Sequence, residues 1–318
     1  MAGVQIFAEN REQTRELLNI GGRLAAGLET TLSAYIYNDA AGADEYIAWG
    51  ADEVLLLPPL AADQPLDSYL PVLEAEAKSN DPDLILVAAT FRGREIAARL
   101  AMYLHTGMCS DCIAVDIAKG SKSLQMERLT YGGAAIQQVA FSTRPALATI
   151  PLRLFEPAAR QEGRSGKIRE LPAPPPSPLQ VLERKKKTAA GKDIAQAGIV
   201  VCAGRGIDKK EDLALVAQLA AALEGEVGCT RPVSEEQHWL PEELCIGLSG
   251  VSVKPGLYIG LGVSGQVQHL TGIRDAKVIC AINKDEKAPL FAAADFGIVG
   301  DLYQVVPQLI AEVKRVKS

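Results

Sequence analysis

The segment from residue 256 to residue 301 constrains the fold more than any other part of this chain of 318 residues. An apolar run at 257–261 leads into a glycine turn with the spacing Gly260-x-Gly262-x-x-Gly265, and a helical pattern opens at Gln266. A strand that enters a glycine turn and then a helix presents free backbone N–H groups beside the positive end of the helix dipole. This arrangement favours a bound phosphate.

Polar residues follow the next two expected strands where each strand ends. The expected strand 276–282 is followed by Asn283, Lys284 and Asp285, and the expected strand 296–300 is followed by Asp301. In an open parallel sheet, ligands bind beyond the carboxyl ends of the strands. The second half of the chain therefore has the pattern of a nucleotide-binding domain.

Nearly continuous apolar strands alternate with helical patterns in both halves of the chain. Such strands, separated by helices, indicate parallel sheets covered on both faces. We therefore predict an α/β fold with an N-terminal parallel-sheet domain of nucleotide-binding type and a C-terminal doubly wound parallel-sheet domain. The expected strands are 4–8, 31–37, 53–57, 84–89, 147–154, 198–203 and 226–228, with short strands after 113, and the expected helices are 14–26, 40–49, 69–79, 93–101 and 212–222.

One change in composition marks the expected domain boundary. Five prolines within 171–178 favour an extended segment, and the basic run 184–187 follows. The basic run fits a solvated linker or a docking site for an acidic partner. We expect a first domain at 1–170, a linker at 171–193 and a second domain at 194–318.

The loops after the first strand of each domain differ in chemistry. In the first domain the strand is followed by Glu9 and no glycine, and an acidic side chain there repels phosphate. In the second domain it runs into Gly204-Arg205-Gly206. A guanidinium between two glycines suits a bidentate phosphate contact, although a plain surface turn explains the pattern equally well.

Composition narrows the class of protein. With 39 acidic and 33 basic residues and a net charge of −6, nothing indicates a nucleic-acid partner. No apolar run approaches the roughly 20 residues needed to span a bilayer, so we expect no membrane insertion. Six scattered cysteines, and a first segment without a basic region or cleavage site, lead us to expect a cytoplasmic location.

The glycine turn has a competing interpretation. Gly260-x-Gly262-x-x-Gly265 matches the dinucleotide fingerprint, and Asp285 lies where a nicotinamide-binding fold places its ribose carboxylate. The turn, however, comes late in its domain rather than after the first strand. A nicotinamide-dependent oxidoreductase therefore remains the alternative.

Two further patterns concern cysteine and histidine. Cys109 and Cys112 form a single Cys-x-x-Cys pair without the remaining ligands of a zinc site, and we interpret them as packing residues. His105 and His238 lie in segments without supporting chemistry. His269, in contrast, follows the glycine turn directly and is expected near the ligand.

Taken together, these segments resemble the alpha subunit of electron transfer flavoproteins along the whole chain. The matching motifs are Gly93-Arg-Glu-Ile-Ala-Ala-Arg, Tyr131-Gly-Gly-Ala, Val201-Cys-Ala-Gly-Arg-Gly-Ile207, Gly228-Cys-Thr-Arg-Pro-Val233, Tyr258-Ile-Gly-Leu-Gly-Val-Ser-Gly-Gln-Val-Gln-His-Leu270, Ala281-Ile-Asn-Lys-Asp285, Ala288-Pro289 and Ala294-Asp-Phe-Gly-Ile-Val-Gly-Asp301. The motif at 228–233 and Ile246-Gly-Leu-Ser-Gly250 are more similar to the Fix-type branch than to the mitochondrial type.

The resemblance implies FAD as the cofactor, bound mainly by the second domain. It implies that Arg205 contacts the phosphate region, that Arg231 lies by the flavin ring, where a positive charge favours reduced flavin, and that Ser249 lies near the reactive nitrogen. It further places His269 near the pyrimidine edge of the flavin and Asn283 and Asp301 at the adenosine. The full implied set is Arg205, Thr230, Arg231, Ile246, Gly247, Leu248, Ser249, Ser264, Gly265, Gln266, Val267, Gln268, His269, Asn283 and Asp301.

One position departs from the family pattern. Many members have Gln-Thr-Gly where this chain has Leu248-Ser249-Gly250, so one polar contact to the flavin is lost. Hydrogen bonds and nearby charges set a flavin's potential. The substitution therefore affects redox tuning rather than FAD binding.

The function implied is electron carriage rather than bond-making catalysis. The resemblance implies a heterodimer with an electron transfer flavoprotein beta subunit. Because the first domain lacks a recognisable ligand loop, we expect this domain and the linker to serve chiefly to dock the beta subunit. It also implies a donor of the acyl-CoA dehydrogenase type, or a flavoprotein or quinone-linked acceptor. A nucleotide-sensing module without a redox role is a third possibility.

Overall fold

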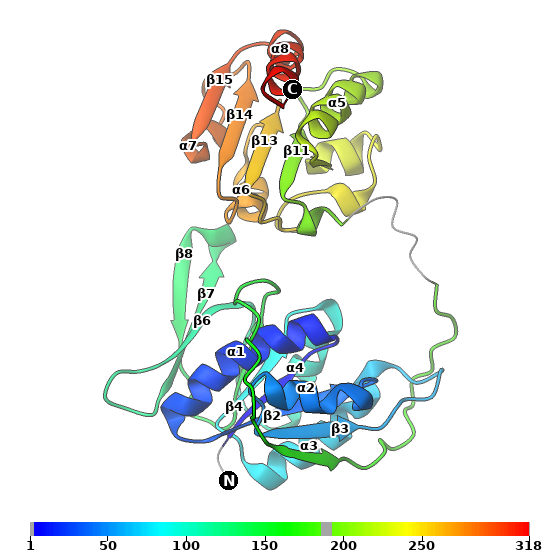
Figure 1. The fold of residues 1–318 in the computed structure, drawn as a ribbon, viewed down its shortest axis with the longest axis vertical. Helices are drawn as coiled ribbons and strands as arrows, with labels where there is room; N and C mark the ends of the chain where they lie inside the picture. The colour runs from blue at the N-terminus through cyan, green and yellow to red at the C-terminus, as the bar shows by residue number, and fades with distance from the viewer. Residues whose placement is uncertain (1–2, 186–192, 318) are drawn as a thin grey trace. The chain divides into compact units, whose positions relative to one another are not determined.

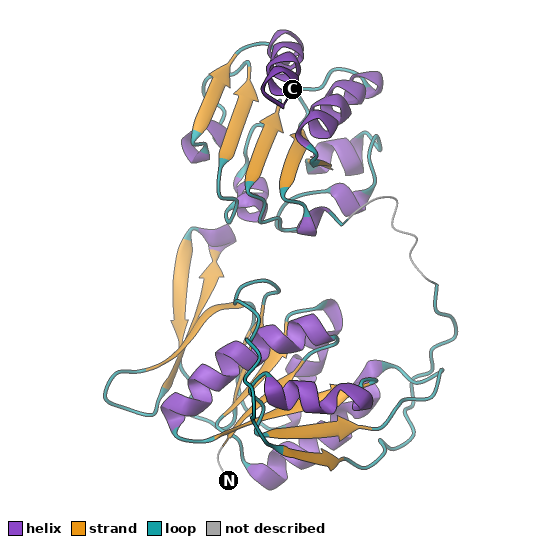
Figure 2. Cartoon of the chain, in the orientation of Figure 1, coloured by secondary structure: helices purple, strands orange, loops and turns teal. Residues whose placement is uncertain are grey.

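The computed structural model describes residues 3–185 and 193–317. The chain divides into two compact units, the first ending at Lys185. Each unit has an open parallel sheet with helices on both faces (Figures 1 and 2). The predicted α/β fold with two parallel-sheet domains is confirmed.

The first unit contains a seven-stranded parallel sheet with the order β10-β3-β2-β1-β4-β9-β5. Its strands are β1 (Gly3–Phe7), β2 (Thr31–Tyr37), β3 (Glu53–Leu57), β4 (Leu84–Ala88), β5 (Met108–Cys109), β9 (Ala146–Ile150) and β10 (Lys167–Glu170). Its helices are α1 (Arg11–Leu28), α2 (Ala43–Ala48), α3 (Leu70–Asn80) and α4 (Phe91–Tyr103). A separate antiparallel sheet consists of β6 (Cys112–Ile117), β7 (Leu124–Thr130) and β8 (Ala135–Val139).

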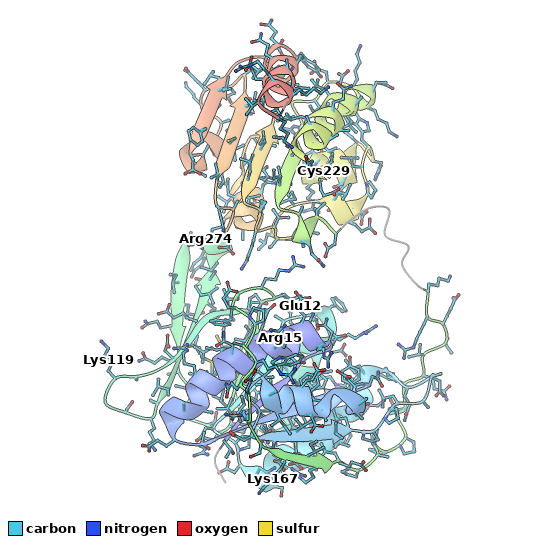
Figure 3. The ribbon with its side chains drawn as sticks, viewed as in Figure 1. Glu12, Arg15, Lys119, Lys167, Cys229 and Arg274 are labelled. Atoms are coloured by element: carbon cyan, nitrogen blue, oxygen red, sulfur yellow. The ribbon has the colours of Figure 1, made fainter. Side chains whose placement is uncertain are left out.

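Alternation along the strands divides the first unit into two cores. Val4 and Ile6 of β1 point into the core formed with α1 and α2, whereas Phe7 points into the core formed with α3 and α4. Because successive side chains of a strand face opposite sides, a strand covered on both faces is apolar at nearly every position, and β1 follows this rule except at buried Gln5. On the α1 face, the Arg15 guanidinium, labelled in Figure 3, lies 4.8 Å from the centre of the Trp49 ring.

The proline-rich segment packs on the first unit. The Leu171 N–H donates to the Leu56 carbonyl at 2.8 Å, and the Val181 N–H donates to the Asp63 carbonyl at 2.7 Å. Arg184 donates to the Gln64 carbonyl at 2.9 Å. The first unit therefore extends beyond residue 170, the expected end of the first domain, because the chain that follows bonds to β3 and to the loop after β3. Residues 186–192 of the expected linker lie outside the described residues.

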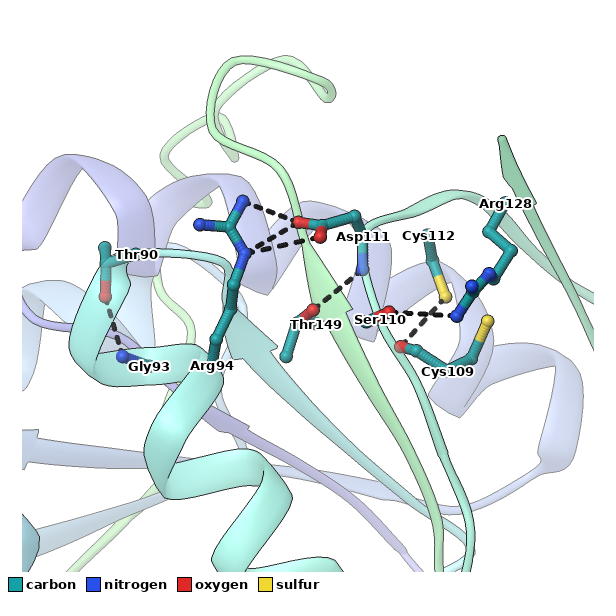
Figure 4. A network of polar contacts seen from close by, with 9 residues as sticks. All are labelled: Thr90, Gly93, Arg94, Cys109, Ser110, Asp111, Cys112, Arg128 and Thr149. Atoms are coloured by element: carbon teal, nitrogen blue, oxygen red, sulfur yellow. Dashed lines mark hydrogen bonds and ion pairs between the residues drawn. The ribbon is translucent and has the colours of Figure 1, made fainter. Parts of the chain in front are cut away.

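The Cys-x-x-Cys pair lies where β5 passes into β6 (Figure 4). Both thiols are buried in the core on the α1 face, and the Cys112 thiol donates to the Cys109 carbonyl at 3.4 Å. Between them, Asp111 accepts from Arg94 at 2.7 Å. Within the described ranges, no group of three or more His, Cys, Asp or Glu side chains could hold a metal ion.

The second unit contains a five-stranded parallel sheet with the order β12-β11-β13-β14-β15. Its strands are β11 (Ile199–Ala203), β12 (Glu226–Cys229), β13 (Leu257–Leu261), β14 (Ile279–Asn283) and β15 (Phe296–Val299). Its helices are α5 (Leu213–Leu223), α6 (Val267–Ile273), α7 (Leu290–Ala293) and α8 (Leu302–Lys317).

Helices cover this sheet on both sides as well. Val216 of α5 and Val306 of α8 share one core with Val201, and Ile273 of α6 and Leu290 of α7 share the other with Val200. None of the helices built from described residues is long and apolar enough to cross a membrane.

Candidate functional site

The second unit has a cavity of about 760 Å³ beyond the carboxyl ends of its central strands. The chain passes from β11 to β12 on one side and later returns to β13 on the other, so the strand order switches between β11 and β13. Open parallel sheets bind their ligands at such a switch point. Thirteen of the fifteen residues expected at the site line this cavity: Arg205, Thr230, Arg231, Ile246, Gly247, Leu248, Ser249, Ser264, Gly265, Gln266, Gln268, His269 and Asn283.

Two expected residues do not line the cavity. Val267 begins α6 with its side chain 54% exposed. Asp301 lies between β15 and α8, where its carboxylate accepts from the Tyr303 N–H at 3.0 Å and its carbonyl accepts from the Val305 N–H at 3.0 Å. Asp301 therefore caps α8, which is the usual role of an aspartate directly before a helix.

Several lining residues were absent from the set of FAD contacts that the resemblance implies. Lys284 and Asp285, which were expected at the ligand edge of the sheet because they follow a strand, line the cavity beside Asn283. Glu236 ends a π-helical turn and Cys245 follows a short 3-10 turn, and no sequence signal distinguishes them. The other lining residues outside that set are Gly206, Asp208, Pro232, Gly262, Val263 and Ala288. His105 and His238, both exposed residues with positive φ, lie outside the cavity.

The glycines around the switch point hold two loops in backbone contact. The Gly206 N–H donates to the Gly262 carbonyl at 3.0 Å, and the Gly204 N–H donates to the Leu261 carbonyl at 2.9 Å. A Cβ on Gly206 would lie 2.8 Å from the Gly262 Cα, and Gly262 has φ +62°. The Gly-Arg-Gly turn and the first part of the glycine fingerprint therefore need glycine for their contact with each other, whatever the ligand.

Gly265 is required for a different contact. Its φ is +80°, and a Cβ there would lie 2.6 Å from the Leu290 Cα. The Leu290 N–H donates to the Ser264 carbonyl at 3.0 Å, which keeps this loop against the start of α7. A side chain at position 265 thus meets protein backbone, not the open cavity.

Unpartnered donors gather along this edge of the cavity. Among the described residues, none accepts a hydrogen bond from the N–H of Ser264, Gly265 or Gln266. The hydroxyl oxygen of Thr230 is buried and also has no partner there. Buried polar groups are nearly always hydrogen-bonded in proteins, so the Thr230 hydroxyl suits a polar ligand, and the N–H groups of 264–266 are available to the same ligand.

The charged residues of the cavity are exposed. The side chains of Arg205 and Lys284 form no ion pair with the described part of the chain. Arg231 pairs with Glu235, Nε to Oε2 at 2.6 Å, across a π-helical turn at Pro232–Glu236. The cavity therefore offers two free cations for an anionic ligand, while the charge of Arg231 is partly balanced.

His269 is buried and held by both ring nitrogens. Nδ1 lies 3.0 Å from the Ile246 carbonyl oxygen, and Nε2 lies 2.7 Å from the Tyr258 hydroxyl. Burial lowers the pKa of His269 to about 4, against the opposing effect of the Ile246 carbonyl. The imidazole is therefore neutral at physiological pH.

Asn283 joins two loops at the cavity. Its Nδ2 donates to the Val263 carbonyl at 2.9 Å, and its Oδ1 accepts from the Asp285 N–H at 3.0 Å. Asp285 in turn accepts from the Lys287 N–H at 2.9 Å. Both side chains thus shape the turn after β14.

Comparisons with known proteins agree with this architecture. Residues 6–176 match the electron transfer flavoprotein domain, and residues 193–274 match the electron transfer flavoprotein FAD-binding domain. An electron transfer flavoprotein subunit named YdiR from Escherichia coli K12 is 37% identical over 98% of this chain and 98% of the relative. A protein named FixB from Clostridium saccharobutylicum is 35% identical over 99% of this chain and 97% of the relative. A FixB from Escherichia coli O127:H6 is 34% identical over 98% of each.

The residues present fit the FAD that this family of domains binds. Ligand cavities of about 300–1,000 Å³ are typical, and this one lies within that range. Arg205, Lys284 and the free N–H groups of 264–266 suit a pyrophosphate. The unpartnered hydroxyl of Thr230 gives the cavity a buried polar contact for the cofactor.

We expect Gly265→Ala to lower FAD retention, because the new Cβ displaces the loop from Leu290. Gly120→Ala is the matched control, since Gly120 has a similar φ of +77° but open space around it. The positive φ alone costs each variant about 1–2 kcal/mol. Urea unfolding should show a larger loss for Gly265→Ala, and flavin absorbance after gel filtration should fall for it alone. Equal losses in the two variants would contradict the steric argument.

We expect the second unit to lose stability as the pH falls from 6.5 towards 4. The unfolded chain protonates His269 near pH 6.5, whereas the folded state does so only near pH 4, so protons favour unfolding in this window. The resulting loss in the free energy of unfolding is about 3 kcal/mol at most. Urea unfolding at several pH values should show this slope in the wild type and in His105→Gln, and a weaker slope in His269→Gln. A wild-type profile that is flat from pH 7 to pH 4 would exclude a buried neutral imidazole.

Proposed function

Because the chain belongs to the electron transfer flavoprotein alpha-subunit family, in its Fix-type branch, we propose that it passes electrons between a dehydrogenase and a downstream acceptor through FAD. It is an electron-transfer protein rather than an enzyme that makes or breaks bonds of a substrate. The observation that carries the proposal is the cavity at the switch point, because it brings together free cations, free N–H groups and one buried unpartnered hydroxyl.

When bound, FAD supplies the reversible uptake of electrons, and the residues of the chain bind and orient it. We assign Arg205, Lys284 and the backbone of 264–266 to the phosphates. Thr230 offers the buried hydroxyl contact. Arg231 and Ser249 are assigned to the flavin ring, where positive charge favours the reduced form. Leu248, 60% exposed, adds an apolar surface at the position where many relatives of the family have glutamine.

The proposed complex is a heterodimer with an electron transfer flavoprotein beta subunit. Its donor would be of the acyl-CoA dehydrogenase type, and its acceptor a flavoprotein or a quinone-linked protein. We assign the docking of the beta subunit to the first unit. All six cysteines are free, five of them buried, which supports a cytoplasmic location.

The nicotinamide alternative is not favoured. Its glycine fingerprint is explained by contacts within the protein, since Gly262 meets Gly206 and Gly265 meets Leu290. Its ribose carboxylate, Asp285, already accepts a backbone hydrogen bond within its own turn. The family of the chain is that of a flavin-dependent carrier.

Purification with a co-expressed beta subunit from the same genome tests the proposal. We expect a yellow complex with one heterodimer peak in gel filtration, whose flavin absorbance bleaches when a donor dehydrogenase and its substrate are added. A colourless chain that binds NADH, or a chain that stays monomeric beside the beta subunit, would overturn it.

The Arg231–Glu235 pair gives a prediction on the flavin potential. Arg231→Ala removes the positive charge and should lower the potential, whereas Glu235→Gln frees the guanidinium and should raise it. Both shifts should be small and should diminish with salt, because exposed ion pairs are well screened. A redox titration at low and high ionic strength measures them, with Arg315→Ala on the exposed end of α8 as the control. Shifts of the same sign in both Arg231→Ala and Glu235→Gln would refute the assignment of Arg231.

A further inference from the structure

Tyr258 connects the centre of the second sheet to the wall of the cavity. It is fully buried on β13, which pairs with β11 on one side and β14 on the other. Its hydroxyl lies 2.7 Å from Nε2 of His269, whose own Nδ1 lies 3.0 Å from the Ile246 carbonyl oxygen. Tyr258 itself does not line the cavity, whereas His269 and Ile246 do.

The donor and acceptor roles of these groups determine which atom carries each proton. A carbonyl oxygen only accepts, so Nδ1 of His269 carries the proton that Ile246 receives. A neutral imidazole carries one proton, which leaves Nε2 as an acceptor and makes the Tyr258 hydroxyl the donor. Complete burial raises the pKa of Tyr258 well above its usual value, so the phenol keeps its proton. The thiol of Cys202, 4.0 Å from Nε2, is the other titratable group beside the ring, and burial raises its pKa too.

The segment that His269 holds is one wall of the cavity. Residues 246–249 all line it, and they attach to α6 at two points. One is the bond from His269 to the Ile246 carbonyl, and the other is the Leu248 N–H donating to the Gln268 carbonyl at 2.8 Å. A Cβ on Gly272 would lie 2.6 Å from the Gly247 nitrogen, so helix and wall are in backbone contact.

We propose that Tyr258 is a positioning residue of the FAD site: its hydroxyl fixes His269 as the Nδ1–H tautomer, and His269 thereby anchors the wall 246–249 to α6. This inference rests on the proposed function only for the identity of the ligand. It gives His269 a structural task, because neither ring nitrogen is left with a free proton to donate into the cavity.

The tautomer is measured directly in the full chain labelled with 15N-histidine. Imidazole correlation spectra at pH 7 should show two solvent-exposed rings, those of His105 and His238, and one ring with a protonated Nδ1 and an accepting Nε2. In Tyr258→Phe that ring should lose the signature of the hydrogen bond to Nε2. A wild-type His269 with a protonated Nε2 would overturn the proposal, whether or not any variant folds.

FAD affinity provides the second measurement. Tyr258→Phe should weaken FAD binding about three- to tenfold, as expected for the loss of one buried hydrogen bond. The matched control is Tyr35→Phe, which removes a buried hydroxyl, 2.9 Å from the Gln5 Oε1, in the other unit. Unchanged affinity in Tyr258→Phe, or an equal loss in both variants, would contradict the positioning role.

Two replacements of His269, each with an amide near the position of one ring nitrogen, distinguish its two hydrogen bonds. Asparagine places an amide N–H near the position of Nδ1 and so retains the bond to Ile246, whereas glutamine reaches the position of Nε2 and loses it. We expect His269→Gln to weaken FAD binding more than His269→Asn, and the reverse order would count against the anchor. Failure of the wild type to bind FAD at all would refute the proposed function, while the tautomer measurement would still decide the role of Tyr258.

Discussion

The close approach of two backbone segments at the switch point determines the geometry of the second unit. Gly204 and Gly206, after β11, lie against Gly262, after β13, with hydrogen bonds of 2.9 and 3.0 Å to the Leu261 and Gly262 carbonyls. No residue with a Cβ fits at this crossing without displacing backbone. Because these hydrogen bonds hold the loop after β11 against the loop after β13, Arg205 and the 264–266 segment line the same cavity. The ligand groups therefore depend on a contact that involves no side chain.

The first unit has the same type of parallel sheet, but its described residues make no glycine contact of this kind at its switch point. Its strand order also switches, between β1 and β4. There, however, Glu9 after β1 contacts the Thr90 hydroxyl at the start of α4, and its other oxygen pairs with Arg92 at 3.3 Å. Thr90 also caps α4 by accepting from the Gly93 N–H at 2.8 Å. Side chains of the protein thus bond to one another where an open sheet usually binds a ligand, and a carboxylate there opposes a phosphate.

Local sequence patterns predicted most strands of both units because these strands are apolar and most of them are buried on both faces, although the apolar edge strand β15 is exposed. They missed β5, which has only two residues, and β10, whose sequence Lys-Ile-Arg-Glu has the composition of an exposed loop. Strand β10 is held by pairing with β3, more than a hundred residues earlier, and by the bonds of Arg169 to Glu53 and Glu76. The expected start of β14 at 276 was also too early, because Ala276 closes a turn onto Ile273. Long-range pairing and turn closure leave no periodic signal in a single sequence.

The sequence also predicted most of the site, because most lining residues belong to local motifs, whereas contacts that depend on packing could not be predicted. The rule of strand ends pointed to Asn283, Lys284, Asp285 and Asp301, and the first three line the cavity. Asp301 caps α8 instead of lining the cavity, and its contact with the adenosine stays a prediction. The orientation of His269 was beyond sequence reasoning as well, because Tyr258, eleven residues away, faces it only after β13 and α6 have packed.

The charged side chains of the cavity are exposed, whereas its buried polar side chains are neutral. Its buried groups, Thr230, Cys245 and His269, include no permanent charge, whereas Arg205, Arg231 and Lys284 are exposed. Burying an unpaired charge is costly, so a cavity open to solvent carries its cations at the edge. Salt weakens the interactions of these exposed charges, whereas the buried neutral groups keep the same geometry. Shape and hydrogen bonding at this site are therefore intrinsic to the chain, and the electrostatic part of the flavin potential depends on the ionic strength.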